Sequence, residues 1–123
     1  MKSTQPSPSS RLSSFVYAAR GLHAAWRSEP NLRIHAVAAA AVVGAGLWYQ
    51  LNAGEWALLF LAMGLVVVTE LLNTALEALA NKVSPAFDPQ MGLVKDLAAG
   101  AVLVAAIAAV VIAVCVFWRH LHL

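Results

Sequence analysis

An apolar stretch of the sequence, VVVTELLNTALEALA (66–80), carries three polar side chains that could do chemistry: Glu70, Asn73 and Glu77. Their spacing of i, i+3 and i+7 places them on one face of a helix. Glu77 would lie roughly 10 Å further along this helix than Glu70, at about 1.5 Å per residue. A glutamate near the centre of a bilayer costs roughly 2.5–3.5 kcal/mol on insertion scales. Carboxylates in such a place therefore need either a structural partner or a chemical role.

Ionisable residues from two other segments join these glutamates. Lys95 and Asp96 open the last apolar stretch, and Glu29 lies at the foot of the first. Carboxylates at a membrane interface can hold a magnesium ion together with substrate phosphates, and a lysine can neutralise phosphate oxygens as a point charge. A deeper carboxylate such as Glu70 could accept a proton from a hydroxyl at headgroup depth. The set therefore suits phosphoryl transfer from a water-soluble donor to a lipid-soluble acceptor.

The residues alone leave two other interpretations of the buried glutamates open. The carboxylates could make interhelical hydrogen bonds without catalysis, or they could carry protons in a small oligomeric proton-coupled membrane transporter. An enzyme for this phosphoryl transfer, a kinase, is favoured over the transporter by Lys95, Asp96 and an expected helix at the membrane surface. The sequence has neither a G-x-x-x-x-G-K-[ST] motif nor a Gly-rich loop with an H-R-D catalytic loop. A kinase with this sequence would belong to neither common soluble class.

The composition is that of a membrane protein. Of the 123 residues, 61% are hydrophobic and 11% are charged, whereas a soluble domain has about 45–50% apolar and about 25% charged residues. This length suits a single domain. The net charge is only +2, and no basic stripe is interleaved with aromatic residues, which argues against nucleic acid as a partner.

Three stretches are long and apolar enough to span a bilayer, for which about 20 residues are required. They are 34–51, 56–80 and 97–118. We therefore expect an all-α integral membrane protein with three transmembrane helices. Residues 1–10 are polar and rich in Pro and Ser, and we expect them to form a disordered tail before one membrane domain over 11–123.

The connections between the expected spans have distinct signals. A helix over about 13–29 has apolar residues at helical spacing and is expected to lie in the membrane interface as an amphipathic helix. Pro30 should bend the chain from this helix into the first span. The connection 81–92 contains Pro85, Pro89 and Gly92, so it cannot be one continuous helix.

The distribution of basic residues predicts the orientation. Seven of them precede the first span or lie between the second and third: Lys2, Arg11, Arg20, Arg27, Arg33, Lys82 and Lys95. The positive-inside rule then places the N-terminus and the loop 81–96 in the cytoplasm. Aromatic residues gather at the opposite, outer boundary: Trp48, Tyr49, Trp56 and Trp118.

Two segments, GEWALLFLAMGLVVVTELLNTALE and KDLAAGAVLVAA, resemble the prokaryotic diacylglycerol kinase family, which includes undecaprenol kinases. The specific part is E-x-x-N-T-A-x-E followed by K-D-x-A-A-G-A-V, and GLHAAWRSEPNLRIH is similar to the family's amphipathic helix and entry into the first span. The resemblance covers roughly residues 15–118. It implies an ATP-dependent lipid kinase of the bacterial inner membrane that phosphorylates undecaprenol or diacylglycerol with magnesium. It also implies a homotrimer with active sites at subunit interfaces.

The resemblance implies a role for individual residues. Glu70 corresponds to the general base, which also meets the lipid, and Asn73 supports the catalytic cluster. Glu29 and Glu77 correspond to the magnesium ligands. The implied nucleotide-binding residues are Tyr17, Glu29, Glu77, Asp88, Lys95 and Asp96. The implied lipid-binding residues are Arg11, Trp26, Arg33 and Glu70, although Trp26 and Arg33 could equally be simple interface anchors.

Two local features bear on the substrate and the nucleotide. The segment EPNLRIH (29–35) is more similar to the undecaprenol kinase branch than to the diacylglycerol branch. His35 belongs to that pattern and is interpreted as an interface residue. In the segment 84–92, where diacylglycerol kinases offer acidic and histidine side chains to the nucleotide, this sequence supplies only Asp88.

Overall fold

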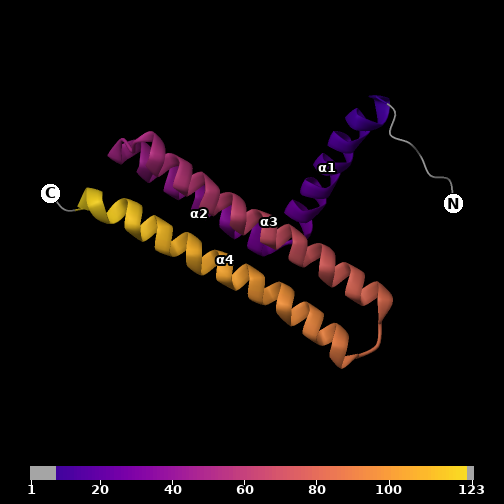
Figure 1. The fold of residues 1–123 in the computed structure, drawn as a ribbon. Coiled ribbons are helices and arrows are strands. Elements are labelled where there is room, and N and C mark those ends of the chain that lie inside the picture. Colours follow the sequence, from indigo (N-terminus) through magenta and orange to yellow (C-terminus); the bar gives the residue numbers. More distant parts are fainter. Residues whose placement is uncertain (1–7, 122–123) are drawn as a thin grey trace.

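The computed structural model describes residues 8–121 and folds them into four helices. In chain order these are α1 (Pro8–Ser28), α2 (Pro30–Tyr49), α3 (Ala53–Val83) and α4 (Pro89–Leu121) (Figure 1). No strand occurs between residues 8 and 121. Helices α2, α3 and α4 are each long and apolar enough to cross a membrane. The expected all-α fold with three candidate spans is therefore confirmed, and the chain is a multi-pass membrane protein.

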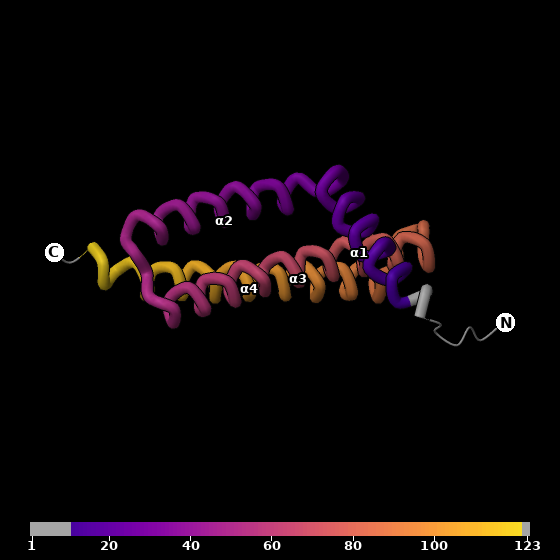
Figure 2. Tube along the Cα trace, turned by 90° about the horizontal axis from the view of Figure 1, so that it is seen from above, coloured from indigo at the N-terminus to yellow at the C-terminus, as the bar shows by residue number. Residues whose placement is uncertain are grey.

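The α3–α4 hairpin is the main packing unit of the chain. The two helices run antiparallel side by side, whereas α2 approaches them at one end and diverges toward the other (Figure 2). Buried alanines let α3 and α4 pack closely, among them Ala62, Ala98 and Ala105. Helix α1 leaves the start of α2 at a steep angle to the hairpin (Figure 1) and contacts α3.

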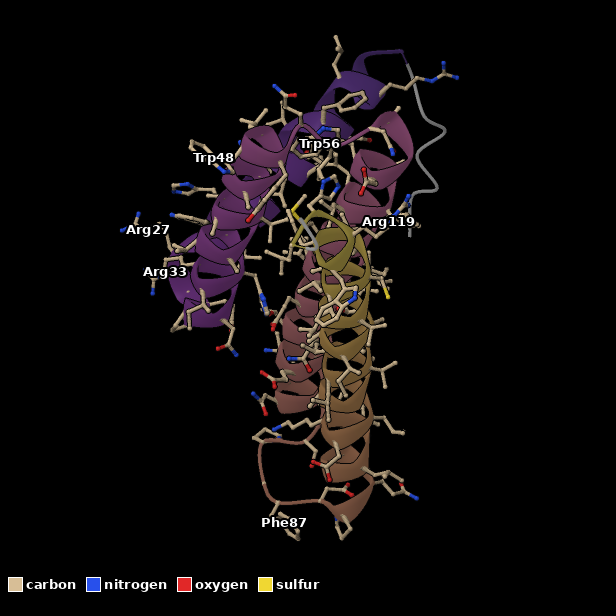
Figure 3. The ribbon with its side chains drawn as sticks, turned by 90° about the vertical axis from the view of Figure 1, so that its left-hand side faces the viewer. Arg27, Arg33, Trp48, Trp56, Phe87 and Arg119 are labelled. Atoms are coloured by element: carbon tan, nitrogen blue, oxygen red, sulfur yellow. The ribbon has the colours of Figure 1, made fainter. Side chains whose placement is uncertain are left out.

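The end of the molecule at the α2–α3 turn holds the tightest packing. Leu59 is 1% exposed and forms a core with Leu51 and Val116. A Cβ atom added at Gly46 would lie 2.6 Å from Cη2 of Trp56, so only glycine lets α2 approach the first turn of α3 this closely. Trp48, Trp56 and Arg119 are all at the opposite end of the molecule from Phe87, which lies at the α3–α4 loop (Figure 3).

The bend between α1 and α2 follows from the dipeptide Glu29–Pro30. The residue before a proline is driven out of the helical region, and Glu29 is accordingly extended, with φ −113° and ψ 102°. Pro30 then occupies the first turn of α2, where its missing N–H costs nothing. The expected bend at Pro30 is confirmed.

Several element boundaries differ from those expected. Helix α1 begins at Pro8, so residues 8–10 are helical instead of part of a tail, and residues 1–7 lie outside the described residues. The first span ends at Tyr49 instead of residue 51, because Gln50 turns into the left-handed region with φ 54°.

Helices α3 and α4 are also longer than the expected spans. They extend to Val83 and from Pro89, so that only residues 84–88 are non-helical within the connection 81–92. The proline positions explain both limits. Ser84 precedes Pro85 and ends α3, whereas Pro89 is tolerated as the first residue of α4.

The unequal lengths of α2 and α3 determine where the polar residues lie along the helices. Helices α2 and α3 share the turn at residues 50–52, but α2 has 20 residues and α3 has 31. At about 1.5 Å per residue, α3 therefore extends roughly 16 Å beyond the start of α2. Glu70 lies alongside the first turns of α2, and Glu77 lies in the part of α3 that extends past it.

Candidate active site

Glu70 is the most buried charged side chain on the predicted reactive face. The residue is 4% exposed, and its Oε1 atom lies 3.3 Å from Nε2 of His35. His35 comes from the second turn of α2, so the contact joins two helices across 35 residues of sequence. The side chain of His35 is 27% exposed and that of Glu70 is 6% exposed, which places His35 on the more open side of the pair.

Asn73 and Glu77 form a second polar pair one turn further along α3. The Asn73 Nδ2 atom donates to Glu77 Oε1 at 3.5 Å, which is the long limit of a hydrogen bond. The Oδ1 atom of Asn73 is buried and has no hydrogen-bond partner among residues 8–121. Nearby hydroxyls do not reach these groups, since Thr74 Oγ1 donates to the backbone oxygen of Glu70 at 3.0 Å. Asn73 and Glu77 thus keep oxygen atoms free for a ligand.

An apolar cavity of about 440 Å³ lies between α2 and the α3–α4 hairpin. Its wall is made of aliphatic side chains from all three helices, with Leu22 and Trp26 of α1 at one end. His35 also lines this cavity and is its one ionisable residue within the described part of the chain. A hydrocarbon chain in the cavity would therefore end beside the His35–Glu70 pair.

Three of the residues predicted to bind the nucleotide lie around the α3–α4 loop. Lys95 Nζ donates to Asn81 Oδ1, a contact that joins the two helices near the loop. Asp88 caps the start of α4, because its Oδ1 atom accepts the backbone N–H of Gln90 at 2.8 Å. Asp96 is exposed on the first turns of α4. Binding of nucleotide by Asp88, Lys95 and Asp96 stays a prediction.

The remaining predicted site residues lie on α1 and at its junction with α2. Tyr17 is exposed, and the guanidinium carbon of Arg20 lies 5.7 Å from the centre of its ring. Trp26 lines the cavity. Arg33 points away from the α3–α4 hairpin (Figure 3), and Arg11 is exposed near the start of α1. The structure thus places Trp26 beside the cavity and leaves the lipid contacts of the two arginines as predictions.

The predicted magnesium ligands supply suitable atoms but not a finished site. Glu29 makes no side-chain hydrogen bond at the start of α2, which leaves its carboxylate available. Glu77 and the unpartnered oxygen of Asn73 add oxygen donors, the kind that magnesium prefers. Within residues 8–121, however, no three His, Cys, Asp or Glu side chains gather as a metal site. The donor chemistry fits magnesium, with substrate phosphates or a second subunit needed to complete its shell.

The structure adds a contact that the sequence analysis did not predict, because the imidazole of His35 lies against Glu70. A signal for this contact was present in the sequence. Helices α2 and α3 are antiparallel neighbours with a short turn, so residues at similar distances from the turn face each other. His35 precedes the turn by 15 residues and Glu70 follows it by 18, counted from residues 50 and 52.

The sequence analysis also did not predict a second glutamate–histidine contact, between Glu55 and His120. Glu55 is 7% exposed, and its Oε2 atom lies 2.8 Å from Nε2 of His120 at the end of α4. Its Oε1 atom accepts the backbone N–H of Asn52 at 3.1 Å, and Asn52 Oδ1 accepts the backbone N–H of Glu55 at 2.9 Å. The spacing of Asn and Glu in NAGE is a sequence signal for this capping box.

The fold and the site define a small multi-pass membrane protein in which His35 links an apolar cavity to a row of acidic and amide groups on α3. Comparison with known proteins gives the family. Residues 16–117 match the prokaryotic diacylglycerol kinase family. The chain is 39% identical to the undecaprenol kinase of Bacillus subtilis (strain 168) over 104 residues, which cover 85% of each chain.

Two diacylglycerol kinases are also similar to this chain. The one from Escherichia coli (strain K12) is 34% identical over 104 residues, which cover 85% of each chain. The one from Synechocystis sp. is 43% identical over 105 residues, which cover 85% of this chain and 60% of that longer protein. The chain belongs to the prokaryotic diacylglycerol kinase family and is a lipid kinase. Membership favours the kinase over the transporter and implies ATP as the co-substrate.

Proposed function

We propose that this protein transfers the γ-phosphate of magnesium-bound ATP to the hydroxyl of undecaprenol or diacylglycerol in the bacterial inner membrane. The observation that carries the proposal is the position of Glu70. Its carboxylate is 4% exposed and contacts His35, which lines an apolar cavity, and the oxygen atoms of Asn73 and Glu77 follow it along α3. A lipid from the membrane and a nucleotide from water can meet along such a face.

Glu70 is the proposed general base. Its carboxylate accepts the proton of the lipid hydroxyl while the hydroxyl oxygen attacks the γ-phosphorus and ADP leaves. Asn73 supports the catalytic cluster through its contact with Glu77 and its free Oδ1 atom. Lys95, close to the α3–α4 loop, would neutralise phosphate oxygens. The proton ends on Glu70, and the phosphoryl group ends on the lipid.

Glu29 and Glu77 are the proposed magnesium ligands. Bound magnesium neutralises charge on the phosphate oxygens and orients the phosphates of ATP. The proposal is supported by the free carboxylate of Glu29 and by the oxygen donors of Asn73 and Glu77. Tyr17, Asp88 and Asp96 would bind the nucleotide, whereas Trp26, Arg11 and Arg33 would contact the lipid.

A homotrimer is the proposed assembly. A single chain leaves α2 loosely packed on the hairpin and leaves many large apolar side chains of its spans exposed, such as Phe60, Leu65 and Leu72. The unpartnered Oδ1 atom of Asn73 would gain a partner from a substrate or a second subunit. The site at a subunit interface could then complete the magnesium shell that one chain leaves open.

The proposed orientation has the N-terminus and residues 81–96 in the cytoplasm, with α1 along the membrane surface as an amphipathic helix. It is supported by the seven basic residues on that side and by the exposed apolar residues Phe15, Leu22 and Trp26 of α1. A cysteine at position 88, in a Cys115→Ala background, should resist an impermeant thiol reagent in intact cells and react after lysis. Ready labelling in intact cells would overturn the orientation and the access of ATP.

The activity is tested by incubating purified protein with magnesium and γ-labelled ATP and a panel of lipids, including undecaprenol and diacylglycerol. We expect label in the lipid fraction for the wild type and for Glu55→Gln, whose substitution lies at the opposite end of α3. Glu70→Gln should give almost none. The absence of labelled product from every lipid hydroxyl would overturn the proposed function.

Undecaprenol is the proposed preferred lipid. The segment EPNLRIH and the similarity to the undecaprenol kinase of Bacillus subtilis support this choice, although diacylglycerol kinases are also among the relatives. The measurement is the turnover of both lipids by the same preparation, at matched mole fractions in the same detergent. A higher kcat/KM for diacylglycerol would reverse the assignment.

A further inference from the structure

His35 connects two features that the proposed function uses separately. It lines the apolar cavity of about 440 Å³, and its Nε2 atom lies 3.3 Å from Oε1 of Glu70. The residues around it in the cavity wall are alanines, valines, leucines and a methionine, together with Trp26. His35 is thus the polar contact between a space fit for hydrocarbon and the buried carboxylate.

The Glu70 carboxylate has no other side-chain partner in the described part of the chain. The hydroxyls of Thr69 and Thr74 donate to backbone oxygens, and the Asn73 amide donates to Glu77. A glutamate side chain has three rotatable bonds, and burial without a partner is costly for a charged group. The orientation of Glu70 therefore depends on a residue from another helix.

The two carboxylate oxygens of Glu70 also have different surroundings. A carboxylate only accepts hydrogen bonds, so Nε2–H of His35 donates to Oε1. No hydrogen bond to Oε2 occurs among residues 8–121, which leaves this atom to accept the proton of a substrate hydroxyl. Because His35 holds one oxygen, the other has a fixed direction when the substrate arrives.

We propose that His35 is a positioning residue of the lipid kinase: it holds Glu70 so that Oε2 meets the hydroxyl of a lipid whose hydrocarbon chain lies in the cavity. This inference rests on the proposed function of Glu70 as general base. It assigns His35 a role in the chemical step and gives the cavity an occupant, the apolar chain of the lipid substrate.

The first test compares His35→Leu, which removes the donor, with His35→Gln, whose amide N–H can replace it. Loss of one hydrogen bond to a charged group corresponds to a change of roughly 10- to 100-fold in a rate or equilibrium constant. We expect His35→Leu to lower kcat by about that factor with the KM for ATP unchanged, and His35→Gln to recover much of the loss. His120→Leu removes the other His–Glu contact, 2.8 Å long, and should leave kcat unchanged.

The second test asks whether His35 acts through Glu70. His35→Leu is combined with Glu70→Asp, whose shorter side chain withdraws the carboxylate from the imidazole, and kcat is measured for both single variants and the double variant. We expect the double variant to be no slower than Glu70→Asp alone, because the two substitutions remove the same interaction. If the double variant instead loses kcat by the product of the two single losses, His35 acts independently of Glu70 and the inference is overturned.

The outcomes separate this inference from the proposed function. If the wild type phosphorylates lipid and Glu70→Gln does not, but His35→Leu has normal kcat, only the role of His35 is wrong. If His35→Leu and His35→Gln lose assembly and kcat together, His35 is a packing residue and the inference is also wrong. If the wild type phosphorylates no lipid, both proposals fail.

Discussion

Each end of α3 carries a buried glutamate that contacts a histidine, but the hydrogen bonds of the two carboxylates are satisfied to different extents. Glu55 and Glu70 are both buried, at 7% and 4% exposure, and each contacts a histidine from a neighbouring helix. Both oxygens of Glu55 are occupied, one by His120 and one by the backbone of Asn52. Glu70 has one oxygen held at 3.3 Å and one without a partner among the described residues. The hydrogen bonds of the first carboxylate are complete within the fold, whereas the second has one oxygen that, on the proposed function, would accept from a substrate.

The same difference extends to the neighbours of each glutamate. Near Glu55, Gly46 and Trp56 pack without space for one more carbon atom. Near Glu70, α2 diverges, a cavity opens, and Asn73 keeps a buried oxygen without a partner. A buried polar group without a partner is costly to folding, so its persistence is better explained by a ligand than by packing. We therefore propose that one end of α3 serves stability and the other serves chemistry.

The largest effect is expected from Glu70→Gln. Removing the base should lower kcat by roughly 10²–10⁴-fold, since general-base catalysis contributes about that much. The amide still hydrogen-bonds to His35, so assembly and the affinity for magnesium-ATP should be unchanged. Turnover and nucleotide binding are measured on the same preparation. Normal turnover would reduce Glu70 to a packing polar group like Glu55.

Glu77→Gln should act on binding instead of the chemical step. A ligand carboxylate lost from the magnesium site should raise the KM for magnesium-ATP by about tenfold or more, with a smaller change in kcat. The KM is measured at several magnesium concentrations, and excess magnesium should partly restore activity. An unchanged KM together with a large loss of kcat would move Glu77 from the metal to the catalytic step.

Gly46→Ala should affect stability at the opposite end. The added Cβ would lie 2.6 Å from Trp56, and such overpacking costs about 1–3 kcal/mol. The control is Gly44→Ala, two residues away on the same helix, where a Cβ meets nothing within 4 Å. Thermal unfolding in detergent is the measurement. Equal midpoints for the two variants would show that α2 does not pack tightly on α3 here.

Asn52→Ala is expected to have the smallest effect. It removes the side-chain acceptor of the capping box at the start of α3, which is worth about 1 kcal/mol. Turnover per folded protein should not change, because the proposed site residues lie in the opposite half of α3. Asn31→Ala, at an exposed position of α2, is the control. A loss of turnover larger than the loss of folded protein would link the two ends of α3.

The sequence predicts well whatever depends on local chemistry. Long apolar runs predict the three spans, the i, i+3, i+7 spacing puts Glu70, Asn73 and Glu77 on one face, and Pro30 predicts the bend that leaves Glu29 extended. The limits of the helices are predicted less well. Pro8 and Pro89 look like helix breakers in the sequence, yet each is tolerated as the first residue of a helix.

Contacts between helices are the part that the sequence predicts poorly. The His35–Glu70 and Glu55–His120 contacts depend on how helices are rotated and staggered against each other, and this is decided by packing at positions such as Gly46. The distances of His35 and Glu70 from the α2–α3 turn give their level along the two helices, but a lone histidine in an apolar stretch does not show how its helix is rotated. The magnesium shell is a further case, because one chain holds only part of the donor set.

The most direct test compares Glu70→Gln with Glu55→Gln in the same detergent, with turnover and the thermal midpoint measured for each. Both substitutions remove one negative charge from a buried position on α3, so they are matched in chemistry and differ in place. We expect turnover to fall roughly 10²–10⁴-fold only in Glu70→Gln, and the midpoint to fall only in Glu55→Gln. Parallel losses in both variants, or normal turnover of Glu70→Gln, would contradict the division of α3 into a structural and a reactive end.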